Sequence, residues 1–210
     1  MQLIGKLDSP FVRRVAVSLK LLGRPFEHLD WSVGRDQSRI RAINPLGRVP
    51  TLVLDSGEVL MESSAILDHL DQEAGPAHSL LPMSGSDRRR ALRLLALATG
   101  AAEKCVAQIH EQAFRPEEKR HAPWVERCVE QMRGSLGELD RSVAPARAPL
   151  WTLGERFSQA DITSAIVFTF IADAVGIDRA RYPALTSLTA RCEEMPVFRE
   201  TYMGFAAPRA

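Results

Sequence analysis

The stretch Asn44-Pro45-Leu46-Gly47-Arg48-Val49-Pro50-Thr51-Leu52 combines a loop with the start of a strand. Its two prolines and its glycine indicate the loop, and the apolar run that begins at Thr51 is typical of the strand. Pro50 stands at the mouth of that strand, where a residue need not donate a hydrogen bond to the sheet. If the Val49–Pro50 bond is cis, the bend leaves the Val49 N–H and C=O free to pair with an extended peptide. An ordinary loop that leads into a strand is the alternative interpretation.

The residues on both sides of this stretch alternate between strand and helix patterns. Ser9-Pro10 is a typical helix start and Gly23 a typical helix stop, and Asn44-Pro45 ends a second helix, because a proline disfavours helical geometry in the residue before it. The turn Asp55-Ser56-Gly57-Glu58 joins two short apolar runs into a hairpin. The predicted elements are strands at 3–5, 26–31, 51–54 and 59–61 and helices at 11–22, 35–43 and 63–70. Their order is βαβ, then ββα.

The pattern changes after residue 75. Residues 75–85 are rich in glycine, proline and serine, a composition typical of a domain boundary. Everything that follows is predicted to be helical apart from the loop 144–149, which holds two prolines. The predicted helices are 86–114, 123–143, 158–176, 183–195 and 197–205. We therefore expect a small α/β domain at 1–80 and an all-α domain at 86–210.

Composition and charge exclude several classes of protein. The 210 residues hold 27 basic and 26 acidic side chains, a net charge of +1, which offers no electrostatic footprint for nucleic acid or for an anionic membrane. The longest apolar stretch, 162–177, is too short to span a bilayer and contains Asp173. No signal peptide is recognisable at the start of the chain. A cytoplasmic protein is expected.

The three cysteines, Cys105, Cys128 and Cys192, are odd in number, far apart and form no CxxC pair. This argues against a disulfide framework, a structural zinc site and a dithiol redox motif, and no metal is expected. All three lie in helical stretches, where they are expected to be small core residues rather than reactive thiols.

Two short motifs could bind an anion at the start of a helix. Ser9 precedes Pro10 and Phe11, and its hydroxyl could either cap that helix or donate a hydrogen bond to an anion held there by the helix dipole. Glu62-Ser63 follows the hairpin and offers a carboxylate, a hydroxyl and unpaired N–H groups. This second set suits the α-ammonium and α-carboxylate of an amino acid, although a helix cap alone would also explain it.

The motifs at Ser9, at residues 44–52 and at Glu62-Ser63 follow one another along the predicted βαβ-ββα unit. In this order they resemble the motifs of the glutathione S-transferase superfamily. Members of that superfamily have a thioredoxin-like first domain and an all-α second domain. The stretch Leu153-Gly154-Glu155-Arg156-Phe157-Ser158-Gln159-Ala160-Asp161-Ile162 looks like the signature of the second domain. In it, Ser158 and Asp161 form an S-x-x-D capping box, so that Asp161 serves folding rather than catalysis. The resemblance runs from Met1 to about Phe205.

The resemblance implies that glutathione is the co-substrate and that it lies along the first domain. Val49, followed by Pro50, would pair with the cysteinyl backbone, and Arg48 could reach the glycine carboxylate. Glu62 and Ser63 would hold the γ-glutamyl end. Ser9 would stand beside the sulfur and favour its thiolate form, so it would stabilise the nucleophile without being one itself. Asp8, adjacent to the site, would oppose a second anion unless its carboxylate points away.

The resemblance places the pocket for a small hydrophobic electrophile between the two domains. Phe11, His110, Phe114 and Trp124 are candidate wall residues, although a helical histidine such as His110 is more often simply packed or solvated. A homodimer is implied as well. The expected activity is glutathione transfer. A glutathione-dependent disulfide reductase, an isomerase and a non-catalytic binding module on the same fold remain open alternatives.

Overall fold

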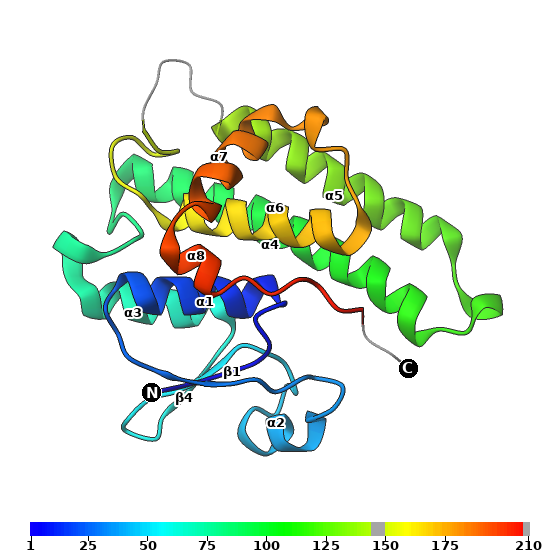
Figure 1. The fold of residues 1–210 in the computed structure, drawn as a ribbon, viewed down its shortest axis with the longest axis horizontal. Coiled ribbons are helices and arrows are strands. Elements are labelled where there is room, and N and C mark those ends of the chain that lie inside the picture. The colour runs from blue at the N-terminus through cyan, green and yellow to red at the C-terminus, as the bar shows by residue number, and fades with distance from the viewer. Residues whose placement is uncertain (144–149, 208–210) are drawn as a thin grey trace.

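The computed structural model describes residues 1–143 and 150–207, so the predicted proline-containing loop 144–149 lies outside the described residues. A four-stranded sheet is followed along the chain by a bundle of helices (Figure 1). This is the fold class that the sequence predicts, a thioredoxin-like α/β unit followed by an all-helical region. Among the described helices, none has the length and apolar character that crossing a bilayer requires.

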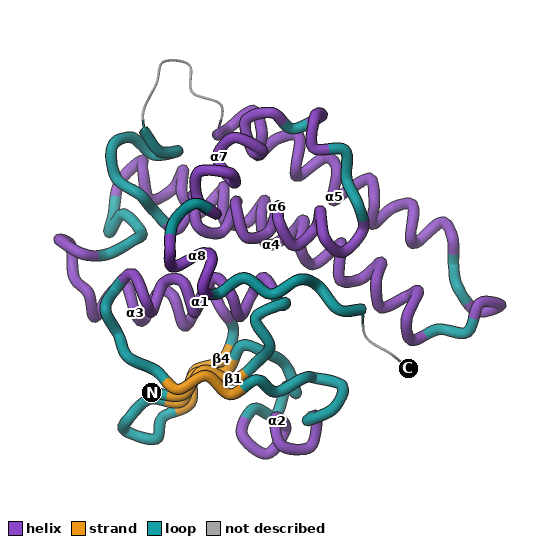
Figure 2. The backbone as a smooth tube through the Cα atoms, viewed as in Figure 1, coloured by secondary structure: helices purple, strands orange, loops and turns teal. Residues whose placement is uncertain are grey.

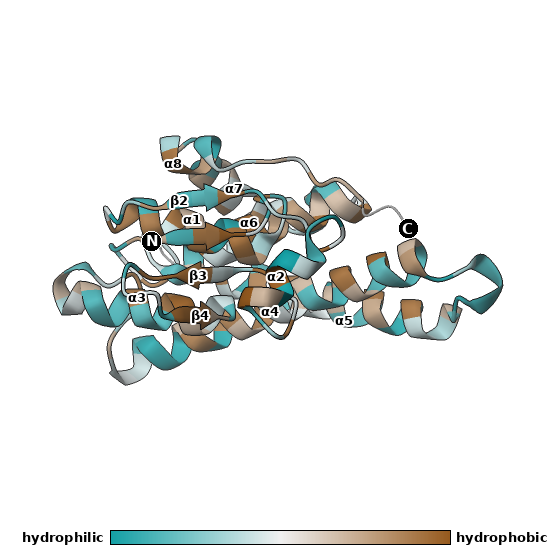
Figure 3. Ribbon diagram, turned by 90° about the horizontal axis from the view of Figure 1, so that it is seen from below, coloured by the Kyte–Doolittle hydropathy of each residue, from teal (hydrophilic) through white to brown (hydrophobic). Residues whose placement is uncertain are grey.

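The sheet has the strand order β2-β1-β3-β4, which Figure 3 shows from below. Strand β1 pairs in parallel with β2 and antiparallel with β3, and β3 and β4 form the predicted hairpin. The strands are β1 (Gln2–Ile4), β2 (Glu27–Leu29), β3 (Thr51–Val53) and β4 (Val59–Met61). Because β1 is central, the segment that leaves its end is held by neighbours on both sides.

Two helices cover one face of the sheet. They are α1 (Pro10–Leu21) and α3 (Ser63–His78), whereas the short α2 (Gln37–Ile43) lies on the other side (Figure 2). Helix α1 is buried on two sides: Val12 packs with the sheet residues, and Val17 packs with the helical region. The start of α1 is therefore fixed by contacts with both parts of the molecule.

The second part of the chain consists of helices packed around α6. In chain order they are α4 (Gly85–Phe114), the 3-10 turn η1 (Glu117–Lys119), α5 (Ala122–Val143), α6 (Gln159–Val175), the 3-10 turn η2 (Arg179–Arg181), α7 (Pro183–Glu193) and α8 (Pro196–Glu200). The first thirteen residues of α6 are all buried, as its apolar sequence requires. Helix α6 contacts α4 and α7 within the bundle and α1 across the two parts of the fold.

The predicted capping box is confirmed at the start of α6. The Asp161 carboxylate accepts hydrogen bonds from the Ser158 N–H at 2.9 Å, from the Ser158 hydroxyl at 2.7 Å and from the Thr152 N–H at 2.8 Å. Asp161 is fully buried and far from the start of α1 in sequence, so its role is to fix the preceding loop and the helix start.

Two predicted helix ends are wrong. The third helix does not end at residue 70 but continues to Gly75, whose φ of 70° breaks it before a last turn to His78. The polar residues of this extension carry no apolar periodicity that a sequence pattern could show. The predicted helix 197–205 is only Pro196–Glu200, and the rest of that segment is a tail without regular structure.

The three cysteines lie in the core, as predicted. Each is completely buried and none forms a disulfide. Burial raises the pKa of Cys105 to about 12 and raises the pKa of Cys192 as well, so neither is a ready thiolate.

Candidate functional site

Two loops come into close contact at the end of β1. The Val49–Pro50 peptide bond is cis, which was one of the two alternatives that the sequence left open. Gly5 has a φ of +133°, and a Cβ atom at this position would lie 2.6 Å from Val12 Cγ2 and 2.8 Å from Val49 Cβ. Only glycine allows the two loops to approach so closely. The segment that leads to Ser9 is thus held against the cis-proline loop.

Ser9 is the N-cap residue of α1, but its hydroxyl does not act as a cap. Its backbone is extended, with a φ of −76° and a ψ of 124°, and its side chain makes no capping hydrogen bond. The Ser9 backbone does take part in the turn, because its N–H donates to the Lys6 carbonyl and its carbonyl accepts from the Arg13 N–H. The half-buried hydroxyl therefore stands available at the positive end of a 12-residue helix.

Asn44 shapes the cis-proline loop from inside. Its buried side-chain amide donates to the Arg48 carbonyl at 2.9 Å and to the Thr51 hydroxyl at 2.9 Å. The Arg48 side chain is exposed, and the half-buried Val49 shares no backbone hydrogen bond with any described residue outside regular helices and strands. Sequence analysis used Asn44 only as the end of a helix. Thr51, seven residues after Asn44, carries a hydroxyl that can accept a hydrogen bond from the Asn44 amide. This pair of residues is the signal that could have indicated a buried amide.

The backbone of the site is strained at Glu62. Its φ of 72° is the one positive value among the described residues other than glycine. The Glu62 carboxylate accepts a hydrogen bond from the Ser63 N–H at 3.1 Å and caps α3. Ser63 is almost completely buried, and its hydroxyl makes no hydrogen bond within the described parts of the chain. Backbone strain of this kind costs about 1 kcal/mol or more and is commonly found at ligand sites.

Arg14, which the sequence analysis missed, contacts Ser64 and lies near the Glu62 carboxylate. It is one of the largest fully buried side chains, and one guanidinium nitrogen, Nη2, donates to the Ser64 hydroxyl at 2.9 Å. Its Nε and Nη1 atoms are buried without a partner among the described residues. Burial lowers the pKa of Arg14 to about 10, and the neighbouring Glu62 carboxylate partly opposes that change.

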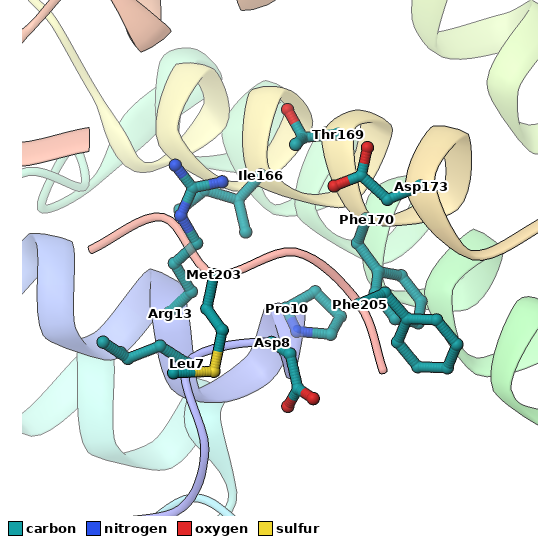
Figure 4. Close-up of a pocket in the computed structure, with 10 residues that line it drawn as sticks. All are labelled: Leu7, Asp8, Pro10, Arg13, Ile166, Thr169, Phe170, Asp173, Met203 and Phe205. Carbon is teal, nitrogen blue, oxygen red and sulfur yellow. The ribbon is translucent and has the colours of Figure 1, made fainter. Parts of the chain in front are cut away.

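A small crevice of about 10 Å³ opens at Asp8 and Pro10, the two chain neighbours of Ser9 (Figure 4). Its walls come from three parts of the chain: the loop before α1 together with the first turn of α1, residues 166–173 of α6, and the tail after α8. The lining residues are Leu7, Asp8, Pro10, Arg13, Ile166, Thr169, Phe170, Asp173, Met203 and Phe205. In Figure 4 the Asp8 carboxylate points away from Asp173 and from the tail, and it pairs with Lys6 at 3.0 Å.

Arg13 links α1 to the C-terminal helices. Its guanidinium binds both carboxylate oxygens of Glu193, at 3.0 and 2.7 Å, and donates to the Phe198 carbonyl at 2.9 Å. The Thr169 hydroxyl donates to the same Glu193 carboxylate at 2.8 Å. Although Arg13 lines the crevice, its charge is already paired, so it is poorly suited to bind a substrate anion.

The tail after α8 is held over the crevice by two residues. The Tyr202 hydroxyl donates to Asp173 at 3.0 Å, and the Tyr202 ring lies 5.3 Å from the Arg13 guanidinium. The hydrogen bond to Asp173 raises the pKa of Tyr202. Phe205 packs edge-on against Phe170, with the ring centroids 5.5 Å apart. Sequence analysis missed this tail, because it predicts a helix over residues 197–205.

The four candidate wall residues lie outside the lining of this crevice. Phe11 packs against the helical core, and the His110 and Phe114 rings form an edge-on pair with centroids 5.1 Å apart. Trp124 is exposed on α5, where Lys104 approaches its ring at 5.5 Å. Burial lowers the pKa of His110. The structure thus brings His110 and Phe114 together, and neither of them lines the crevice.

Known proteins match the chain over both of its parts. The family model of the glutathione S-transferase N-terminal domain matches residues 3–78. YibF, an uncharacterized GST-like protein of Escherichia coli (strain K12), is 30% identical over 141 residues, 67% of this chain and 68% of that protein. The maleylacetoacetate isomerase of Pseudomonas aeruginosa is 26% identical over 204 residues, 90% of this chain and 89% of that protein.

A solved structure extends the match to the whole chain. A glutathione S-transferase from Methylobacterium radiotolerans, crystallised in complex with glutathione sulfonate, is 31% identical with a TM-score of 0.90. The match covers 100% of this chain and 98% of that one.

Proposed function

The chain belongs to the glutathione S-transferase superfamily, and from this premise we propose that it binds glutathione and activates the thiol beside Ser9 for attack on a small hydrophobic electrophile. The observation that carries the proposal is the Ser9 hydroxyl, which stands at the start of α1 without a capping bond. A serine that served only to cap the helix would use its oxygen for that purpose.

The groups around the two loops support a binding mode for the peptide. The N–H and C=O of Val49, at the cis bond before Pro50, would pair with the cysteinyl backbone of glutathione as an added strand does. Glu62 and Ser63 would receive the γ-glutamyl ammonium and carboxylate, because an acidic side chain, a free hydroxyl and a helix start meet there. The exposed Arg48 would reach the glycine carboxylate.

The chemical role proposed for Ser9 is electrostatic. A free thiol has a pKa of about 8.5, so only a few per cent is thiolate at neutral pH. A hydroxyl donor at a helix N-terminus favours the anion and lowers that pKa. With an aryl halide, the thiolate sulfur then forms a bond to the ring carbon, and the halide leaves with the electron pair of the broken bond.

The side chains that line the crevice in Figure 4 support a neutral, apolar second substrate, for which the tail has to move because the crevice itself measures only about 10 Å³. Phe170, Phe205 and Met203 provide apolar surface close to the Ser9 loop. Arg13 is bound to Glu193, and Asp173 has no cationic partner among the described residues. An anionic electrophile would find no free positive charge in this lining.

One experiment tests the proposal most directly. The purified protein is applied to immobilised glutathione, and turnover is measured with a chromogenic aryl halide and with a small disulfide for the wild type, Ser9→Ala and the exposed control Ser38→Ala. We expect the wild type to be retained and to turn over the aryl halide. The value of kcat/KM for the aryl halide should be about 10- to 100-fold lower in Ser9→Ala than in the wild type, and unchanged in Ser38→Ala. The rise of kcat/KM with pH should move to higher pH in Ser9→Ala, because the bound thiol loses a donor to its anion.

Different failures of this experiment identify different errors. If the protein is not retained and turns over neither substrate, the non-catalytic binding module is the alternative that remains. Full activity of Ser9→Ala would disprove the role of the hydroxyl. Turnover of the disulfide alone would favour a glutathione-dependent reductase.

Isomerisation is the second candidate, favoured by the relation to the Pseudomonas aeruginosa isomerase. Maleylacetoacetate carries two carboxylates, and the crevice lacks a free cation among the residues that the structure describes. This charge pattern makes the transfer reaction the better supported of the two. Turnover of maleylacetoacetate at a rate above that of the aryl halide would reverse the order.

We further propose two domains, at 1–80 and 86–210, a homodimeric assembly and a cytoplasmic location. The separate apolar clusters of the sheet region and of the helical region support the division into domains. Sedimentation at micromolar concentration tests the assembly, and a monomer there would contradict the homodimer.

A further inference from the structure

His28, on β2, is a histidine that the proposed glutathione chemistry does not use. Strand β2 lies at one edge of the sheet, beside β1 (Figure 3). His28 is in register with Leu3 of β1, and the side chains of two residues in register point to the same face of a sheet. Leu3 packs with Val12 and Leu19 of α1, so the half-buried His28 lies on the face that α1 covers.

The His28 ring donates a hydrogen bond to the backbone of the loop that leads to Ser9. Its Nε2 atom lies 2.7 Å from the carbonyl oxygen of Gly5, the residue that follows the end of β1. A carbonyl oxygen can only accept a hydrogen bond, so Nε2 carries the hydrogen. The bond thus joins an edge strand to the point at which the chain leaves the sheet for the start of α1.

This bond replaces one that the sheet itself does not make. The Gly5 N–H donates to the Leu29 carbonyl at 3.0 Å, as parallel pairing requires. In a continued ladder the Gly5 carbonyl would accept from the Trp31 N–H, two residues after Leu29. The Trp31 N–H instead turns back to the Leu29 carbonyl at 2.8 Å, and no other backbone N–H within the described residues donates to Gly5. Gly5 is buried, so its carbonyl depends on His28 for a partner.

The Gly5 carbonyl belongs to the peptide group that sets the direction of the loop. Glycine rotates more freely than other residues, and a hydrogen bond at its carbonyl fixes the plane of the peptide group between Gly5 and Lys6. Two polar contacts hold the rest of the loop: the Ser9 N–H donates to the Lys6 carbonyl at 3.2 Å, and Lys6 pairs with Asp8. Both join residues of the same loop, so neither fixes its direction relative to the sheet.

We propose that His28 is a positioning residue for the Ser9 hydroxyl, which it aligns with the bound thiol through the peptide group between Gly5 and Lys6. The proposal rests on the proposed function of Ser9. His28 acts through the backbone and is not itself a catalytic residue. A displacement on the order of 1 Å can lower a rate about 100-fold, whereas the glutathione backbone would be held elsewhere, at Val49 and Glu62. Loss of the His28 bond should therefore lower kcat more than the affinity for glutathione.

Three substitutions separate the hydrogen bond from the bulk of the ring. His28→Gln keeps an N–H donor at about the reach of Nε2, His28→Asn places the donor too close to the backbone, and His28→Leu removes it. Turnover of glutathione with the aryl halide is measured for each variant as a function of pH. We expect kcat to fall about 10-fold in His28→Leu and His28→Asn, with KM for glutathione within about threefold of the wild type. His28→Gln should keep kcat within about threefold of the wild type.

The pH profile and a double variant test whether the effect passes through Ser9. The rise of kcat/KM with pH should move to higher pH in His28→Leu, as in Ser9→Ala, and should stay in place in His28→Gln. Adding His28→Leu to Ser9→Ala should lower kcat no further, because the hydroxyl that His28 positions is already gone. His78→Leu, at an exposed position near the end of α3, is the matched control and should change neither kcat nor the pH profile.

An NMR measurement on the ligand-free protein gives a readout that does not depend on turnover. The amide signals of residues 6–9 should shift in His28→Leu and lie close to those of the wild type in His28→Gln. Unchanged signals of residues 6–9 in His28→Leu would overturn the proposal, even if the wild type proves inactive.

The kinetic outcomes separate this proposal from the proposed function. Equal losses of kcat in His28→Gln and His28→Leu, a pH profile that does not move, or a further loss in the double variant would overturn the role of His28. A wild type that neither binds nor turns over glutathione would disprove the proposed function instead.

Discussion

The loops at Ser9 and the crevice beside them present their groups to a ligand in different ways. At the loops, backbone groups take part directly, namely the start of α1, the Val49 N–H and C=O and the first turn of α3, beside the side chains of Ser9, Glu62 and Ser63. In the crevice the available groups are all side chains, most of them from α6 and the tail. Backbone groups tolerate changes of side chain but need exact loop positions, whereas a crevice of side chains changes with single substitutions.

This contrast suits a protein that binds one constant co-substrate and one variable electrophile. The part that binds glutathione should respond to backbone geometry, and the crevice should respond to the identity of its side chains. Single substitutions in each part should separate the two.

Asp161→Ala should have the largest effect, and it should act on stability. The substitution leaves the Ser158 N–H and hydroxyl and the Thr152 N–H unpaired in the core, which is expected to lower the free energy of unfolding by about 3 kcal/mol or more. Urea unfolding of the wild type and the variant measures this loss of free energy. Asp173→Asn, at an exposed position on the same helix, should cost less than about 1 kcal/mol. Equal losses in the two variants would contradict the structural role of Asp161.

Gly5→Ala should break the contact between the two loops. A Cβ atom would collide with Val12 and with Val49, and overpacking of this kind costs about 1–3 kcal/mol. Because Val49 must move away from the Ser9 loop, glutathione affinity should fall at least about tenfold, which corresponds to about 1.4 kcal/mol. Titration calorimetry measures this affinity.

Gly57→Ala is the matched control for that change. Gly57 also has a positive φ, +87°, but a Cβ atom there meets nothing within 4 Å. It should cost about 1 kcal/mol of stability through backbone strain alone and leave glutathione affinity unchanged. If both glycine variants lose affinity equally, the close approach of the loops is not what matters for binding.

Glu62→Gly should weaken binding with little net change in stability. Glycine relieves the strain of a φ of 72° but also removes the carboxylate that accepts the Ser63 N–H, so the free energy of unfolding should change by less than about 1 kcal/mol. The same change removes the carboxylate proposed for the γ-glutamyl ammonium, so glutathione affinity should fall about 3- to 10-fold. Glu62→Gln keeps the strain and should weaken binding without any gain in stability. A Glu62→Gly variant with unchanged affinity would remove Glu62 from the proposed site.

Local sequence patterns were sufficient for most of the fold and for the residues around the loops. Proline, glycine and helix-capping residues act over a few positions, and they placed the hairpin, the starts of α1 and α3 and the Ser158–Asp161 box correctly. The cis Val49–Pro50 bond lies in a loop that packs closely against Gly5, a contact between positions far apart in the chain, so the sequence could offer the cis state only as one alternative.

The crevice could not be predicted in the same way, because its contacts join residues far apart in the chain. Arg13 meets Glu193, 180 positions away, and helical periodicity shows which face of α1 is buried but not which partner covers it. The sequence predicts a helix over residues 197–205, whereas the observed helix ends at Glu200. In the structure Phe205 packs on Phe170 instead. The buried Arg14 looked like any charged helical residue.

Tyr202→Phe should have the smallest effect and should be confined to the crevice. It removes the hydrogen bond to Asp173 and keeps the ring that lies over Arg13, so stability should fall by less than about 1 kcal/mol. The tail then covers the crevice less firmly, and KM for an aryl halide should rise about two- to threefold while KM for glutathione stays unchanged. Steady-state kinetics with each substrate varied in turn measure both constants, and Tyr182→Phe, the same change away from the crevice, is the control. An equal rise in the two KM values would mean that the tail acts on the loops as well, and the separation between backbone-built and side-chain-built parts of the site would no longer hold.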